Sequence, residues 1–245
     1  MSKNIKKIIG AAGLVSIWAI AALLIDDEII LPSIYRVGQR IAFMAKETML
    51  VNPILTTTYR VLLGIFYSLI SASLLAYISY KFSLEDYLSP LLSFMRAIPA
   101  ISMVLIVLFF TNKNALSIIV IFFVCFPIIY ENVLNGLKSI PKEKFELAEI
   151  FDLKSSKIFK YIELPAIIKS ILFALTLAFG LAFKAGATAE VIAGAAGGLG
   201  DLLYMAKLSF EMADLLAVTF IIIILSFIFE SLAKYLYKIF GEKYA

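Results

Sequence analysis

The chain has 245 residues, of which 62% are hydrophobic and only 16% are charged, a composition that excludes an ordinary soluble domain. It contains no histidine and a single cysteine, which excludes histidine-dependent zinc sites, cysteine-pair metal sites and intramolecular disulfides. The net charge of +4 is too small to indicate nucleic-acid binding. Its distribution along the chain is informative instead, as a signal of membrane topology.

The first apolar run, residues 8–25, follows a lysine-rich start and predicts a membrane span. A secretory signal peptide is the alternative, but acidic residues 26–28 follow the run in place of a small-residue cleavage site. We therefore expect a retained first span. Residues 37–50 can then form a surface amphipathic helix. Residues 1–52 are accordingly predicted to be an N-terminal transmembrane helix with an extracytoplasmic amphipathic segment.

Five further apolar runs predict five further spans. The second is expected at 61–80, the fourth at 115–130, the fifth from Pro165 to about 191 and the sixth at 212–229 or as far as 235. The third must run from about 87 to 110, interrupted by Arg96 and Pro99, because the stretch beyond Pro99 is too short to cross ~30 Å of hydrocarbon alone. The sequence thus predicts an all-α membrane protein with six transmembrane helices and a core at 53–238.

Six spans place both termini on one side of the membrane, and the basic residues indicate which side. With both termini cytoplasmic, the inner segments hold most of the lysines, whereas the outer segments hold few basic residues. Basic residues are enriched in cytoplasmic loops of membrane proteins, which supports this orientation. Examples from the inner segments are Lys138, Lys142 and Lys157, and from the outer segments Lys113 and Lys207.

A charged, amphipathic segment at 138–165 lies between the fourth and fifth predicted spans. Pro141 can open a helix in it, because a missing N–H and a fixed φ suit the first helical turn. Apolar residues then recur at i, i+3 and i+6, while glutamates and lysines occupy the opposite face. A second short helix is predicted over 155–161, ending at Leu164-Pro165. Two short helices in a loop between spans are typical of a docking element.

The spacing within this segment resembles the EAA signature of ABC-importer permeases, which reads Glu-Ala-Ala, three residues, Gly, nine residues, Ile-x-Leu-Pro. Every spacing matches, with Leu147 in place of the second residue and Asp152 in place of the glycine. Aspartate is among the few residues that tolerate the positive φ of a turn glycine, so its presence does not contradict the geometry. The resemblance implies that an ATPase docks on Glu146, Leu147, Ala148, Asp152, Ile162, Leu164 and Pro165.

Further motifs follow the order found in the nitrate/sulfonate/taurine branch of these permeases. No single motif is specific, but the ordered set together with the spaced EAA-like loop is. The chain therefore resembles the binding-protein-dependent inner-membrane component of type I ABC importers. The motifs are Leu31-Pro32-Ser33 after the first span, Pro90-Leu91-Leu92 and Arg96-Ala97-Ile98-Pro99 in the third, Ala189-Glu190 near the end of the fifth, and Gly198-Leu199-Gly200 after it.

The resemblance implies a type I permease fold in a multi-pass protein of the plasma or inner membrane. Two such subunits, as a homodimer, would form the pathway for a small solute, a sulfonate-, nitrate- or taurine-like anion or a vitamin precursor. Cytoplasmic ABC ATPase subunits would dock on the EAA-like loops, and an extracytoplasmic binding protein would deliver the substrate. Since the sequence has no Gly-x4-Gly-Lys-Ser/Thr motif, we expect a partner to bind the ATP, and this chain to be neither an enzyme nor a cofactor protein.

A self-contained secondary transporter or channel is the alternative function. Such a protein should show inverted repeats and coupling-ion carboxylates within its spans, and neither is visible. The EAA-like loop would also have no purpose in it. An intramembrane enzyme is disfavoured because the sequence offers no histidine and no metal-binding pair.

Three charged residues inside predicted spans are candidates for the translocation pathway or its gate. Lys184 could attract an anionic group of the substrate, or else extend to the outer interface or pair with Glu190 of the same or a facing subunit. A gate contact is favoured for Glu190 over a substrate contact. Arg96 could line the inner pathway, although bracing of the predicted kink at Pro99 is favoured.

Overall fold

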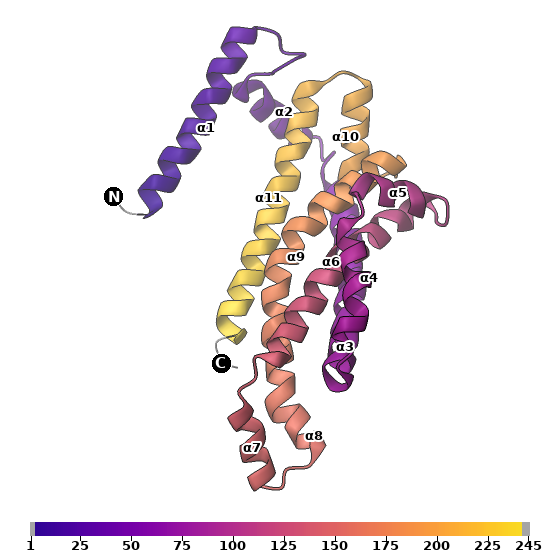
Figure 1. Ribbon diagram of the computed structural model, residues 1–245. Coiled ribbons are helices and arrows are strands. Elements are labelled where there is room, and N and C mark those ends of the chain that lie inside the picture. The colour runs from indigo at the N-terminus through magenta and orange to yellow at the C-terminus, as the bar shows by residue number, and fades with distance from the viewer. Residues whose placement is uncertain (1–2, 242–245) are drawn as a thin grey trace.

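The computed structural model describes residues 3–241, in which all regular secondary structure is helical and no strand occurs. The long helices run side by side as a bundle (Figure 1). In chain order the elements are α1 (Lys3–Ile25), α2 (Ile34–Lys46), α3 (Val51–Phe82), α4 (Glu85–Ala97), α5 (Ala100–Leu108), α6 (Lys113–Lys138), α7 (Lys142–Ile150), α8 (Ser155–Ile158), the π-helical turn η1 (Phe159–Glu163), α9 (Leu164–Ala193), α10 (Leu199–Leu208), α11 (Met212–Leu236) and the π-helical turn η2 (Tyr237–Gly241).

The connecting elements gather at the two ends of the bundle. Figure 1 shows α7 and α8 as a hairpin that projects beyond one end, which we call the loop end. Helices α2 and α10 lie at the opposite end, which we call the far end. Helix α11 runs from the far end back toward the loop end, so the C-terminal part of the chain lies on the same side as the hairpin.

The core forms where α3, α6 and α9 cross, because glycines let these helices approach closely. A Cβ added to Gly64 of α3 would lie 2.6 Å from Cγ2 of Ile121 on α6. A Cβ on Gly186 of α9 would lie 2.9 Å from Cδ1 of the same isoleucine. Ile121 is fully buried, so one side chain of α6 occupies the space that two glycines leave on its neighbours.

Four helical segments are long and apolar enough to cross a membrane: Val51–Phe82, Lys113–Lys138, Ser155–Ala193 and Met212–Gly241. They contain the predicted second, fourth, fifth and sixth spans. Helices α4 and α5 pass the same test only as a pair, and the apolar part of α1, Ala12–Ile25, is shorter than these spans. Among the described residues there are thus four spans, or five with the bent pair, and the count of six with cytoplasmic termini stays a prediction.

The predicted third span is not one straight crossing. Helices α4 and α5 meet at an angle of 95°. The break falls at Ile98 and Pro99, whose ψ angles of 122° and 132° are extended, as the residue before a proline favours. With 13 and 9 residues, the two helices are only about 20 Å and 14 Å long, so neither crosses the membrane alone. The interruption at Pro99 was predicted, but not a bend near a right angle.

The prediction that the second loop helix ends at Leu164-Pro165 is wrong. Helix α8 continues through η1 into α9, and Ser155–Ala193 is one helical segment. Pro165 directly follows the π-helical turn η1, a local widening that accommodates a proline inside a continuous helix. The wider turn of η1 precedes it, with the Leu164 N–H donating to the carbonyl of Phe159, five residues back. The EAA-like loop and the fifth span are therefore continuous.

Helix α2 is the amphipathic helix expected near the far end, although it spans Ile34–Lys46 where residues 37–50 were predicted. The Ser33 side chain caps it by accepting a hydrogen bond from the Arg36 N–H at 3.2 Å. Its buried side chains include Val37, and the helix packs against α11. Arg40 forms an ion pair with Asp214 of α11, and this hydrogen-bonded carboxylate raises the pKa of the guanidinium.

Helix α1 stands away from the bundle (Figure 1). Its apolar side chains are largely open to the surroundings, with Leu23 and Leu24 80% and 81% exposed. Contact with the bundle runs through Trp18, whose ring stacks on Phe220 of α11 at 5.5 Å and whose indole N–H donates to the Pro32 carbonyl at 3.2 Å. The division of the chain into residues 1–52 and 53–238 stays a prediction.

Candidate functional site

Helix α7 presents large apolar side chains at the surface of the loop end. Leu147, Ile150 and Phe151 are 53%, 76% and 72% exposed. Glu146 is exposed beside them, whereas Ala148 is turned inward with 2% of its surface accessible. The helical spacing of apolar residues thus produces a stripe that nothing within residues 3–241 covers. An exposed apolar patch next to a carboxylate is typical of a protein contact surface.

Asp152 ends α7 in the conformation that the sequence predicted for the position of the signature glycine. Its φ is +46°, in the left-handed region. The Asp152 N–H donates to the Glu149 carbonyl at 3.0 Å, and the Leu153 N–H to the Ala148 carbonyl at 2.9 Å. This pair of bonds is the Schellman arrangement, which satisfies the last carbonyls of a helix. The turn fixes the direction in which the chain leaves the exposed face of α7.

Ile162, Leu164 and Pro165, the second half of the motif, are half-buried behind the hairpin. They lie in η1 and in the first turn of α9, where the hairpin joins the bundle. The residues of the motif therefore fall into two groups, one exposed at the surface and one facing the interior. Glu146, Leu147 and Asp152 are exposed at the surface. Ala148, Ile162, Leu164 and Pro165 are buried or half-buried and support the hairpin from within.

Glu163, inside the same motif, makes a buried connection that the sequence reasoning missed. The side chain is 1% exposed, and it accepts hydrogen bonds from the Lys81 ammonium at 2.6 Å and from the Tyr77 hydroxyl at 3.0 Å. Both partners lie near the C-terminal end of α3, so this carboxylate ties η1 to α3. The available signal was a glutamate between two apolar motif residues, opposite a lysine at the end of a predicted span.

Glu190 is the centre of a second buried network, at the far end. It is fully buried, and its carboxylate accepts hydrogen bonds from Arg60 at 2.8 Å, from the Thr57 hydroxyl at 2.9 Å and from the Gly200 N–H at 3.0 Å. A Cβ on Gly198 would lie 2.4 Å from a Glu190 oxygen, so the backbone of the Gly-Leu-Gly motif approaches the carboxylate directly. The network joins α3, α9 and the start of α10.

Arg60 extends this network to α6. Its second amino group donates to the Asn114 side chain at 3.1 Å and to the Ala196 carbonyl at 3.2 Å. Arg60 was not among the candidate residues singled out from the sequence. The signal was its position three residues after Thr57, which puts two hydrogen-bonding side chains on one face of a helix.

Arg96, at the end of α4, forms an ion pair with Glu131 on α6. The guanidinium also lies 3.5 Å from the Ser93 hydroxyl. These contacts connect α4 to α6 just before the break at Pro99, as expected for a bracing residue. Its assignment to the pathway stays untested.

Lys184 lies exposed on α9, two turns before Glu190. It does not pair with Glu190, whose oxygens are occupied by Arg60, Thr57 and Gly200. No ion pair within residues 3–241 involves Lys184. Pairing with Glu190 of the same subunit is thereby removed from its possible roles, which leaves a pathway charge, an interfacial anchor or a contact with a facing subunit.

Metal ligation is not supported by the described part of the chain, which contains no group of three or more His, Cys, Asp or Glu residues able to hold an ion. Cys125 is buried on α6, with its sulfur 3.9 Å from the Ala178 carbonyl.

Residues 61–243 match the family of binding-protein-dependent transport system inner membrane components. The chain belongs to this family. It is an ABC transporter permease subunit and a multi-pass membrane protein, as the EAA-like loop and the apolar spans predicted. A self-contained transporter or channel is no longer needed to explain the sequence.

Several curated permeases are similar to this chain. The Bacillus subtilis protein SsuC, named for aliphatic sulfonates transport, is 28% identical over 124 residues, which cover 50% of this chain and 45% of SsuC. The Methanocaldococcus jannaschii ABC transporter permease MJ0413 is 25% identical over 91% of this chain and 85% of its own length. The Synechocystis bicarbonate transport permease CmpB is 25% identical over 158 residues, which cover 64% of this chain and 56% of CmpB. For SsuC and CmpB, this chain spans about half of the relative.

Among solved structures, a chain of the MetNI methionine ABC transporter in an inward-facing conformation superposes with a TM-score of 0.65. The match covers 79% of this chain and 97% of the other, at 19% sequence identity. At that identity the likeness concerns the fold alone. It agrees with the predicted type I permease fold.

Proposed function

We propose that this permease forms the translocation pathway of an importer whose energy comes from a separate cytoplasmic ABC ATPase docked on the α7–α8 hairpin. The proposal is supported chiefly by the exposed face of α7, where Leu147, Ile150 and Phe151 stand uncovered beside Glu146. The Asp152 turn and the buried Glu163 hold this face in a fixed orientation. A rigid apolar patch with the Glu146 carboxylate beside it suits a groove that offers apolar walls and a basic side chain.

The rest of the assembly is proposed from the family. Two copies of this chain would face each other across the pathway, and an extracytoplasmic binding protein would present the solute at the far end. The cargo is proposed to be small and anionic, since the relatives SsuC and CmpB are named for sulfonates and bicarbonate and Lys184 offers an exposed positive charge. A vitamin is the second class, because a Chloroflexus aurantiacus relative is named for riboflavin transport.

Co-purification with the cognate ATPase tests the docking site. Glu146→Lys reverses an exposed charge beside the apolar face, and the cost should be about 2–5 kcal/mol if that charge is desolvated in the complex. The ATPase should then be lost from the purified complex, while insertion of the permease in the membrane is unchanged.

The matched control is Glu47→Lys, which makes the same exchange at an exposed glutamate just after α2, at the far end. This variant should keep the ATPase. Retention of the ATPase by Glu146→Lys, or its loss from both variants, would show that the face of α7 is not the docking surface.

A further inference from the structure

A groove of about 690 Å³ opens on the loop end, between α6, α7 and α9. Its floor is the crossing of α6 and α9, where a Cβ on Gly136 would lie 1.7 Å from the Ser170 Oγ. Along α9, Pro165, Lys169 and Phe173 recur every four residues, so they share the face that lines the groove. The last two turns of α6 and its C-cap line the other side with Asn132, Asn135 and Ser139.

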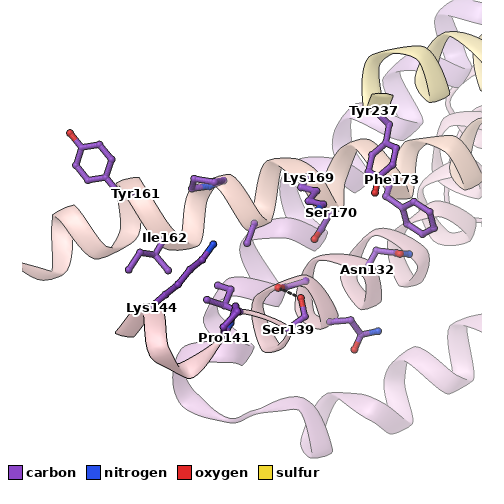
Figure 2. Close-up of a pocket in the computed structure, with 15 residues that line it drawn as sticks. Asn132, Ser139, Pro141, Lys144, Tyr161, Ile162, Lys169, Ser170, Phe173 and Tyr237 are labelled. Atoms are coloured by element: carbon purple, nitrogen blue, oxygen red, sulfur yellow. Dashed lines mark hydrogen bonds between the residues drawn. The ribbon is translucent and has the colours of Figure 1, made fainter. Parts of the chain in front are cut away.

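The lining carries positive charge without a counter-charge. Lys144 reaches into the groove from α7, and Lys169 lies on the opposite wall (Figure 2). No aspartate or glutamate of the described range 3–241 lines the groove. Neither lysine forms an ion pair within residues 3–241. The amide groups of Asn132 and Asn135 and the hydroxyl groups of Ser139 and Ser170 also line it, so the groove offers hydrogen-bond donors and two cations to an anion.

The groove also changes in character along its length. At one end it is closed by Phe173 and Tyr237, whose ring centroids are 5.6 Å apart (Figure 2). Phe173 lies one turn further than Lys169 along α9, in the direction that leads into the bundle. Lysine followed by aromatic rings is the order met on passing from water into the boundary of a membrane. A molecule that suits both ends carries an anionic head and an apolar body.

We propose that the groove binds the phosphate-bearing headgroup of an anionic phospholipid from the leaflet at the loop end. The phosphate would lie between Lys144 and Lys169, and the glycerol and upper acyl chain would extend toward Phe173 and Tyr237. Because Lys144 belongs to α7 and Lys169 to α9, the bound lipid would connect the docking hairpin to the fifth span. This site goes beyond the docking function and does not depend on it.

The test is binding of a fluorescent phosphatidylglycerol to the full-length chain in a neutral detergent. Unlabelled phosphatidylglycerol, phosphatidylcholine and inorganic phosphate serve as competitors. Each basic residue near an anionic lipid contributes about fivefold in affinity. We therefore expect Lys144→Gln and Lys169→Gln each to weaken binding by about fivefold, and the double variant by about 25-fold if the two effects are independent. Phosphatidylcholine should not compete.

The matched control is Lys154→Gln with Lys157→Gln, which removes the same charge from exposed lysines of the hairpin that do not line the groove. It should change the affinity by less than about twofold if the site is local. Equal losses in the control and the groove variants would overturn the proposal, as would competition by phosphatidylcholine. Displacement by millimolar inorganic phosphate would assign the groove to a soluble anion. Loss of the ATPase with unchanged lipid binding would assign the lysines to a protein contact.

Discussion

At the scale of single residues, the energetics of the far end depend on one buried carboxylate. Glu190 and Arg60 are 0% and 6% exposed, and both are supplied with further hydrogen bonds by Thr57, Gly200 and Asn114. Charges removed from water are tolerated only when they are paired in this way. The pair therefore specifies how α3, α9 and α10 meet. Either residue without the other would be a buried, unpaired charge that destabilises the fold.

Removing the charge of Glu190 should accordingly destabilise the fold. We expect Glu190→Gln to lower the free energy of unfolding by about 3–5 kcal/mol, because it leaves Arg60 buried without a counter-charge. The double variant Arg60→Met with Glu190→Met should lose less, since it removes both charges. Denaturant unfolding of the purified proteins measures the free energy of unfolding of the single and the double variant. A single variant as stable as the original chain would contradict this account of the network.

Lys184 differs from Glu190 in that its charge has no ion-pair partner within the described residues, so its role in transport can be tested without disrupting a buried network. If its ammonium faces the pathway, Lys184→Met should keep expression and ATPase binding but reduce uptake of an anionic solute, and Lys184→Arg should restore uptake only in part. Uptake into reconstituted vesicles at saturating binding protein is the measurement. Equal uptake by Lys184→Met and the unmodified chain would identify the lysine as an interfacial anchor.

At the scale of elements, the hairpin is held by a turn at one end and by a buried carboxylate at the other. Asp152 sets the angle between α7 and α8 through its positive φ. Glu163 ties η1 to Lys81 and Tyr77 of α3. Since η1 runs without a break into α9, a displacement of the hairpin has two structured routes into the bundle, one along α9 and one into α3.

Substitutions of Asp152 test the turn. Asp152→Gly should leave the hairpin intact or stabilise it slightly, because glycine adopts a positive φ without strain. Asp152→Val should cost about 1–2 kcal/mol, since a β-branched residue is strongly disfavoured there. Co-purification of the ATPase should therefore survive the glycine variant and decline in the valine variant. Equal retention by both would mean that the turn does not matter for docking.

At the scale of the whole molecule, the sequence predicted what depends on local pattern. Apolar runs located α3, α6, α9 and α11, and motif spacing predicted the left-handed turn at Asp152. A local sequence pattern does not predict which residues of distant segments contact one another. The partners of Glu190 and Glu163 lie 130 and 82 residues away, and they were missed for this reason. The bend at Pro99 and the continuity of α8 with α9 also depend on how the helices pack.

The central claim is that the α7–α8 hairpin is the surface that receives the ATPase. The most direct test replaces Leu147 by cysteine and attaches a thiol-reactive cross-linker to it. The Leu147→Cys change is made in a Cys125→Ala background, which removes the single native thiol. Leu208 at the far end, 56% exposed against 53% for Leu147, is the matched position. The account predicts a covalent adduct of permease and ATPase from position 147 and none from position 208. An adduct from position 208, or none from position 147 in a complex active in transport, would contradict it.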